Sequence, residues 1–176
     1  MALWVFGYGS LLWNPGFDVA EEQMAVLEGY HRSFSMWSIH HRGTPTDRGL
    51  VLALDASAGA SCQGVALRAK PGTEEATLAE LRARELISSA YFEQILPVRL
   101  HDGRQIEAVS YVIDPQHDQY TGPQSLETQA QIIARAKGDR GPNSEYLHNT
   151  QAHLVKIGIH DPDLEWLDAR VRQIAG

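Results

Sequence analysis

The chain has 176 residues, of which 43% are hydrophobic and 21% charged, as is usual for a globular protein with a sizeable core. Its formal net charge of −7 disfavours nucleic acid or an anionic membrane surface as a principal partner. The apolar runs are too short to span a bilayer. The single cysteine, Cys62, excludes an intrachain disulfide. Because the sequence also starts without a basic leader, we expect one cytoplasmic domain covering residues 1–176.

Most of the first two thirds of the sequence has the pattern of β-strands. Leu3–Tyr8 is short, aromatic and β-branched, and it ends next to glycine. Further strands are predicted at 26–36, 49–54, 63–68, 92–100 and 106–113. The last two flank His101-Asp102-Gly103-Arg104, where the Asp-Gly pair can adopt positive φ. This is the clearest hairpin signal in the chain.

Helical patterns dominate the last third. One earlier helix is predicted at Thr73–Ser88, because two glutamates occupy its first turn. A second is predicted at 126–137, a third is predicted to be capped by Asn143, and a fourth begins at Asp161-Pro162. Strands followed by helices favour an α+β fold with a mainly antiparallel sheet, which we expect to close into a small barrel.

The stretch "VFGYGSLLWNPG", Val5–Gly16, leads a strand into two glycines that bracket a tyrosine. Glycine permits positive φ and a close approach of ligand to backbone. Successive N–H groups after such a strand can converge on an anion. The stretch lacks the residues that define a phosphate loop, a dinucleotide fingerprint or a nucleophile elbow. On spacing alone, a tight turn without a ligand remains the alternative.

Glu85 shares one stripe of its predicted helix with Leu78 and Leu81. A carboxylate on a core-facing stripe loses solvation, which raises its pKa toward the range useful for acid–base catalysis near neutral pH. The alternative is a surface ion pair with Arg82, three residues earlier.

Other candidate residues carry weaker signals. The eight histidines form no spacing that is typical of a metal site, so we expect surface or hydrogen-bonding roles for them. Cys62 is predicted to be a small buried residue. Tyr120 and Tyr146 lie in the turn-rich stretches "YTGP" and "GPNSEYL", where each could offer a hydroxyl to a ligand or pack in the core.

Taken together, several stretches resemble the ChaC family of γ-glutamylcyclotransferases, in its glutathione-specific branch. The matching stretches are "VFGYGSLLWNPGF", "GYHRSF", "HRGTP", "CQGVAL", "RE" at Arg84-Glu85, "YTGPQSLE" and "GPNSEYL". They occur in the family's order and cover nearly the whole chain. Where many eukaryotic members follow "RE" with a lysine and two glycines, this chain has Leu86–Ala90, which looks more like the bacterial form.

The resemblance implies a lyase that releases 5-oxoproline and Cys-Gly from glutathione without metal or organic cofactor. It also implies a small β-barrel with surrounding helices. The residues that match the loop holding the γ-glutamyl group are Val5, Phe6, Gly7, Tyr8, Gly9 and Ser10. Glu85 matches the glutamate regarded as catalytic. Arg42, Tyr120 and Tyr146 are candidates for holding the Cys-Gly half, and the oligomeric state stays open.

Three alternative functions remain from the sequence. The chain could act on other γ-glutamyl amines by the same chemistry. It could be an amidohydrolase that uses Ser10 with a histidine. It could also be a binding module that has kept the site without turnover, although the presence of Glu85 disfavours this.

Overall fold

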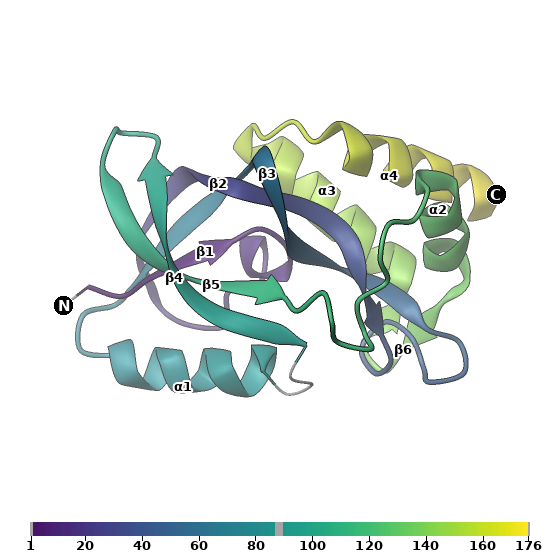
Figure 1. Cartoon of the computed structure of the whole chain (residues 1–176), viewed down its shortest axis with the longest axis horizontal. Coiled ribbons are helices and arrows are strands. Elements are labelled where there is room, and N and C mark those ends of the chain that lie inside the picture. The colour runs from purple at the N-terminus through teal and green to yellow at the C-terminus, as the bar shows by residue number, and fades with distance from the viewer. Residues whose placement is uncertain (1, 87–89, 176) are drawn as a thin grey trace. The chain divides into compact units, whose positions relative to one another are not determined.

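The computed structural model describes residues 2–86 and 90–175 (Figure 1). The chain forms two compact units. The first comprises Met1–Ser33 and Ala53–His117, and the second comprises Phe34–Leu52 and Asp118–Gly176. The strands β2 (Val19–Ser38) and β3 (Gly49–Ala69) belong in part to each unit. The expectation of a single domain stays a prediction.

A small closed barrel is the main feature of the first unit. Its strands are ordered β1-β3-β2-β4-β5, with β5 also paired to β3. The first strand, β1 (Trp4–Gly7), pairs antiparallel with β3 and parallel with β5. All four residues of β1 are buried. The predicted α+β class with a mainly antiparallel barrel is confirmed.

The predicted hairpin is also confirmed. Strands β4 (Tyr91–Leu100) and β5 (Gln105–Ile113) pair antiparallel from Tyr91–Ile113 to Arg99–Gln105. Gly103 in the connecting turn has a φ of 95°, which glycine adopts without a steric cost. The long antiparallel pairing makes this ribbon a rigid part of the barrel wall.

Helix α1 (Glu74–Glu85) packs against the barrel (Figure 1). Its Leu81 joins a buried cluster with Val5, Leu11, Val109 and Tyr111. The predicted helix extends to Ser88, but residues 87–89 lie outside the described residues. The packing of Leu81 fixes the last turn of α1, which carries Glu85.

The strands β2 and β3 are longer than their sequence patterns predict. The two stretches predicted at 49–54 and 63–68 are parts of one strand of 21 residues. Residues 56–59 between them are exposed, so they lack the buried side chains that mark a strand in the sequence. In the barrel β3 lies between β1 and β2, and a strand bonded to neighbours on both sides can include residues that the side-chain pattern does not mark.

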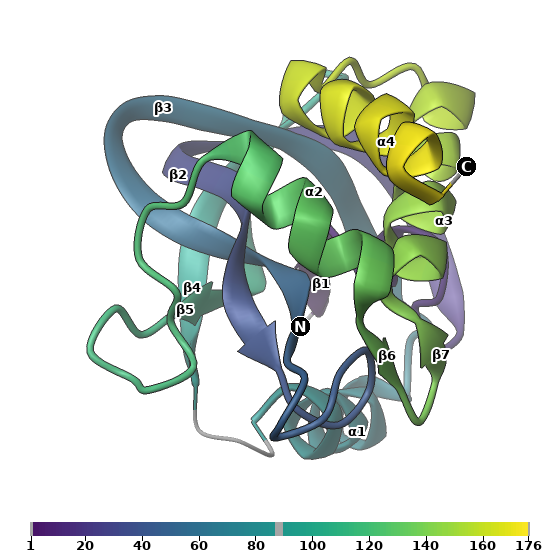
Figure 2. The same ribbon diagram turned by 90° about the vertical axis from the view of Figure 1, so that its right-hand side faces the viewer.

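Three helices form the body of the second unit. They are α2 (Leu126–Arg135), α3 (Asn143–Ile157) and α4 (Pro162–Ala175), and they pack against one another (Figure 2). A two-stranded sheet, β6 (Lys137–Gly138) and β7 (Gly141–Pro142), connects α2 to α3. The Asp161 carboxylate accepts a hydrogen bond from the Leu164 N–H at 3.1 Å, which confirms the predicted start of the fourth helix.

The predicted capping role of Asn143 is wrong. The position before α3 is occupied by Pro142, and no side chain caps the helix. The Asn143 side chain is fully buried and turns to Leu50 of β3. Its Oδ1 accepts a hydrogen bond from the Leu50 N–H, and its Nδ2 donates one to the Leu50 carbonyl, both at 2.8 Å. These two buried bonds satisfy backbone groups of β3, which leaves the side chain unavailable to the helix.

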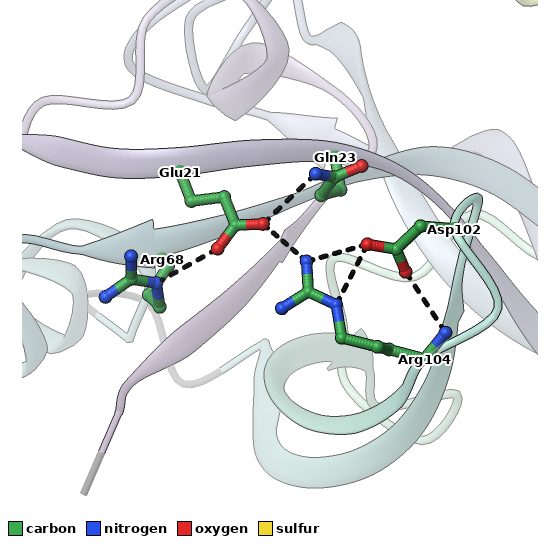
Figure 3. Close-up of polar contacts among 5 residues, drawn as sticks. All are labelled: Glu21, Gln23, Arg68, Asp102 and Arg104. Carbon is green, nitrogen blue, oxygen red and sulfur yellow. Dashed lines mark hydrogen bonds and ion pairs between the residues drawn. The ribbon is translucent and has the colours of Figure 1, made fainter.

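An ion-pair network ties the end of the β4–β5 hairpin to β2 and β3 (Figure 3). Glu21 accepts hydrogen bonds from Arg68 Nε at 3.3 Å, from Gln23 Nε2 at 3.1 Å and from Arg104. Arg104 Nε also donates to Asp102 at 2.9 Å. The hydrogen bonds from Arg104 are the main reason that the pKa values of Glu21 and Asp102 lie below their ordinary values of 4.5 and 3.8.

This network predicts an acid-sensitive contribution to stability. Because both pKa values are lowered in the folded state, the contribution is complete above the ordinary values and is lost as the pH falls through the folded-state values. We expect Arg104→Met to lower Tm by a few degrees at neutral pH. The difference from wild type should stay constant down to about pH 5 and shrink below about pH 4.

Differential scanning calorimetry across this pH range, at low and high salt, checks the expectation. Arg99→Met is the matched control, since Arg99 forms one exposed ion pair, at 3.5 Å from Glu28. Its Tm should follow wild type at every pH. A constant Tm difference for Arg104→Met down to pH 2 would contradict the electrostatic origin.

Candidate active site

The segment that follows β1 is a tight turn. It contains the short 3₁₀ helix η1 (Ser10–Leu12). The Leu12 N–H donates to the Gly9 carbonyl at 2.9 Å, and the Asn14 N–H donates to the Ser10 carbonyl at 2.7 Å. Neither Gly7 nor Gly9 has the positive φ that the sequence suggested, and the residue that does is Gly16, at 78°. We call residues 7–16 the glycine loop.

Gly7 is explained by close packing inside the barrel. A Cβ at Gly7 would lie 3.2 Å from Val65 Cγ2 and 3.3 Å from Leu11 Cβ. A Cβ at Gly64 of β3 would overlap the Gly7 carbonyl oxygen and lie 2.9 Å from the Phe6 ring. Glycines at 7 and 64 therefore let β1 and β3 approach closely at the point where the glycine loop begins.

Arg32 holds the start of the glycine loop. Its side chain is buried on β2, and one terminal nitrogen donates to the Tyr8 carbonyl at 3.1 Å and to the Gln63 carbonyl at 2.9 Å. Arg32 lies within the stretch "GYHRSF", whose sequence pattern indicates no role for it. Its only sequence signal is a charged residue in an otherwise strand-like stretch, and the contact joins segments far apart in the chain.

Arg84 holds the rest of the glycine loop from the last turn of α1. One terminal nitrogen donates to the Asn14 carbonyl at 2.8 Å and to the Pro15 carbonyl at 3.4 Å. The other donates to Ser10 Oγ at 3.0 Å. The sequence pattern indicates no role for Arg84 either. Its guanidinium connects the loop to the residue next to it, Glu85.

The Glu85 side chain is 15% exposed, and its Oε1 lies 3.6 Å from Arg84 Nε. The alternative of a surface pair with Arg82 is wrong, because Arg82 reaches across to β4. There its Nε and a terminal nitrogen donate to the Glu93 carboxylate at 3.0 and 2.9 Å. Glu85 is thus largely buried at the end of α1, next to the guanidinium that contacts Ser10.

Two tyrosines connect the same region to the barrel. The Tyr8 hydroxyl donates to the Tyr111 carbonyl at 3.3 Å, and the Tyr111 hydroxyl donates to Glu93 at 2.9 Å. Burial is the main cause of a raised pKa of Tyr111, followed by Glu93, with a contribution from the negative charge of Glu85. Tyr111 therefore keeps its proton at neutral pH. These contacts bring Tyr8, Ser10 and Glu85 into one region of the first unit.

The other three predicted site residues lie in the second unit, where Arg42 contacts Tyr146. Arg42 is buried, and one terminal nitrogen donates to the Pro142 carbonyl at 3.1 Å and to Glu145 at 3.2 Å. Its guanidinium lies 5.9 Å from the centre of the Tyr146 ring, within the range of a cation–π contact.

Tyr120 and Tyr146 both have contacts within the second unit. The Tyr146 hydroxyl accepts a hydrogen bond from the Leu52 N–H at 3.2 Å. Tyr120 pairs with Met36 in an isolated antiparallel bridge. The role of Arg42, Tyr120 and Tyr146 in holding the Cys-Gly half stays a prediction.

Cys62 is buried, as predicted. Across residues 2–86 and 90–175, no group of three or more His, Cys, Asp or Glu side chains is placed to hold a metal ion. Within the same residues, no helix combines the length and apolar character needed to cross a membrane.

Comparison with known proteins shows the family to which this chain belongs. Residues 3–174 match a family described as ChaC-like protein. The chain is 36% identical over 172 residues to a glutathione-specific γ-glutamylcyclotransferase of Escherichia coli (strain K12), with 98% of this chain and 74% of that protein covered. It is 34% identical over 180 residues to γ-glutamylcyclotransferase 2-3 of Arabidopsis thaliana, with 99% and 90% covered.

The crystal structure of a yeast γ-glutamylcyclotransferase specific to glutathione has a TM-score of 0.88 to this chain. The two share 23% sequence identity, and the superposition covers 98% of this chain and 96% of that one. The fold is therefore that of the γ-glutamylcyclotransferases. Within that class, the chain belongs to the ChaC-like family.

The buried contacts of Arg32 predict a large loss of stability on its replacement. Arg32→Met keeps much of the apolar stem but leaves the Tyr8 and Gln63 carbonyls without this donor. We expect the free energy of unfolding to fall by about 2–4 kcal/mol. Urea denaturation measures the change, and Arg99→Met, an exposed site in the same unit, should cost less than about 0.5 kcal/mol. Equal losses in the two variants would contradict a supporting role for Arg32.

Proposed function

We propose that this protein is a γ-glutamylcyclotransferase that degrades glutathione to 5-oxoproline and cysteinylglycine. The observation that carries the proposal is the position of the Arg84 guanidinium, which contacts both Ser10 of the glycine loop and the Glu85 carboxylate. An acid–base group and a backbone turn suited to an amino-acid head group thus lie on either side of one side chain. Membership of the ChaC-like family supports the same reaction.

The reaction needs little beyond a folded-back substrate. The α-amine of the γ-glutamyl group attacks the γ-carbonyl carbon of the same group and closes a five-membered ring. The new C–N bond replaces the bond to the cysteinyl nitrogen, and no water is consumed. Since nucleophile and electrophile are already tethered, holding the reactive conformer can lower the barrier by roughly 7–11 kcal/mol.

Glu85 supplies the proton transfers in this proposal. The amine arrives as an ammonium group, and the Glu85 carboxylate accepts its proton. The departing cysteinyl nitrogen then receives a proton from the same carboxyl group, which restores the carboxylate. One group serves both steps because each step leaves it in the form that the next one needs.

The glycine loop supplies the backbone donors. The amides of Leu12, Trp13 and Asn14 bond back to the carbonyls of Gly9 and Ser10. The proposal therefore concerns the amides of residues 9–11, which precede this turn. They are suited to the substrate α-carboxylate or to the oxyanion that forms on the γ-carbonyl oxygen.

We disfavour Ser10 as the nucleophile of an amidohydrolase with a histidine, because its hydroxyl is engaged by an arginine. Its Oγ accepts a hydrogen bond from Arg84, and a guanidinium keeps its protons at any physiological pH. Arg84 therefore cannot take the hydroxyl proton as a general base would.

We also place the enzyme in the cytoplasm, because a lone buried cysteine, Cys62, suits a reducing compartment.

Replacing Glu85 tests its role directly. Glu85→Gln keeps the size of the side chain and removes its capacity to carry a proton between the two nitrogens. We expect kcat for 5-oxoproline release from glutathione to fall by about 10²–10⁴-fold. The matched control is Glu80→Gln, an exposed glutamate on the same helix, which should keep wild-type kcat. Wild-type turnover by a folded Glu85→Gln protein would remove Glu85 from the mechanism.

The products formed in ¹⁸O-labelled water separate cyclisation from hydrolysis. Cyclisation takes no oxygen from water, so 5-oxoproline should carry no label by mass spectrometry. Hydrolysis by a Ser10 amidohydrolase would instead release labelled glutamate. Parallel reactions with free γ-glutamyl dipeptides measure whether glutathione is preferred over other γ-glutamyl amines. Labelled glutamate as the main product would overturn the proposed function.

A further inference from the structure

The Arg84 guanidinium has a contact at each of its three nitrogens. One terminal nitrogen donates to the carbonyls of Asn14 and Pro15, and the other donates to Ser10 Oγ. The third nitrogen, Nε, faces Glu85 Oε1 at 3.6 Å. The glycine loop and the Glu85 carboxylate therefore both contact the planar guanidinium of Arg84.

The backbone of the glycine loop lies close to the Arg84 guanidinium. Gly16 has a φ of 78°, and a Cβ built on it would lie 3.1 Å from the Arg84 terminal nitrogen that bonds Asn14 and Pro15. The positive φ favours glycine at this point, and a side chain here would push the Arg84 guanidinium aside by a few tenths of an ångström. Arg84 is 23% exposed; its hydrogen bonds to Ser10 Oγ and the Pro15 carbonyl are partly buried, and the one to the Asn14 carbonyl lies at the surface.

Only arginine meets these geometric demands. Its donors are fixed in a plane and point in different directions, whereas lysine carries one compact charge at the end of a flexible stem. A lysine at 84 would keep the positive charge at the end of α1, where the helix dipole favours a cation. It could not contact Ser10, Asn14 and Glu85 simultaneously.

We propose that Arg84 is a positioning residue that fixes the distance between the glycine loop and the Glu85 carboxylate. This inference rests on the proposed γ-glutamylcyclotransferase activity. The α-amine and the γ-carbonyl of the substrate must lie between these two groups for ring closure and proton transfer to occur together. Arg84 itself exchanges no proton and holds the glycine loop and the Glu85 carboxylate at a fixed separation.

Kinetics of Arg84→Ala and Arg84→Lys test the proposal. We expect kcat for 5-oxoproline release to fall by about 10–100-fold in Arg84→Ala, because a displacement of about 1 Å is enough for such a loss. KM for glutathione should rise as the loop loosens. Arg84→Lys should recover less than half of the loss. Added guanidinium chloride, at concentrations that do not unfold the protein, should restore Arg84→Ala by about tenfold and leave wild type unchanged.

Amide hydrogen exchange gives a readout that needs no turnover. The N–H groups of Leu12, Trp13 and Asn14 are hydrogen-bonded within the glycine loop. Without substrate, these amides should exchange about tenfold faster in both Arg84 variants than in wild type. The amides of β4 should keep their protection, which separates a loosened loop from a destabilised barrel.

The matched control is Arg99→Ala, which removes an exposed arginine of the same unit that lies 3.5 Å from Glu28. It should keep wild-type kcat, KM and exchange. Wild-type kcat and loop exchange in Arg84→Ala would overturn the positioning role while leaving the proposed function intact. Full activity in Arg84→Lys would overturn it too, because charge alone would then suffice. A wild-type protein that releases no 5-oxoproline would overturn both the function and this inference.

Discussion

The close approach of β1 to β3 is the constraint on which the candidate site depends. Gly64 lies so near the Gly7 carbonyl oxygen that no side chain fits between the strands. Every residue of β1 is buried, so the chain leaves the barrel wall at a fixed point. The glycine loop therefore starts from a rigid end. Arg32 holds the Tyr8 carbonyl and Arg84 contacts Ser10 and Asn14, which adds contacts from two other elements to the bonds inside the loop.

Local chemistry decides which parts of the fold the sequence predicts. The β4–β5 hairpin depends on an Asp-Gly turn, and the fourth helix depends on a capping aspartate, so both are readable from a few adjacent residues. The middle of β3 is exposed and has no alternating pattern, so the local sequence does not mark it as strand. Asn143 has the sequence preference of a cap, but two buried bonds to Leu50 take its side chain.

The residues of the candidate site also differ in whether the sequence predicts them. Glu85 and the glycine loop are predicted because a helical stripe, a glycine pair and a family resemblance each mark them. Arg32 and Arg84 are missed, since a guanidinium that contacts carbonyl oxygens many residues away leaves no periodic or spaced pattern. The sequence also leaves open an ion pair of Arg82 with Glu85 as an alternative, whereas the structure pairs Arg82 with Glu93. A neighbour three residues away on the helix competes with Glu93 on β4, and only the packed barrel determines which carboxylate is nearer.

The identity of the residue beside Glu85 also matters for the proposed proton transfers. In the proposed reaction the Glu85 carboxylate first accepts a proton from the substrate ammonium, so the side chain that holds Glu85 in place must not compete for that proton. A lysine or histidine in this place could itself donate or accept the proton and compete with the substrate. Because a guanidinium keeps its protons near neutral pH, Arg84 can hold Glu85 in place without entering the proposed reaction.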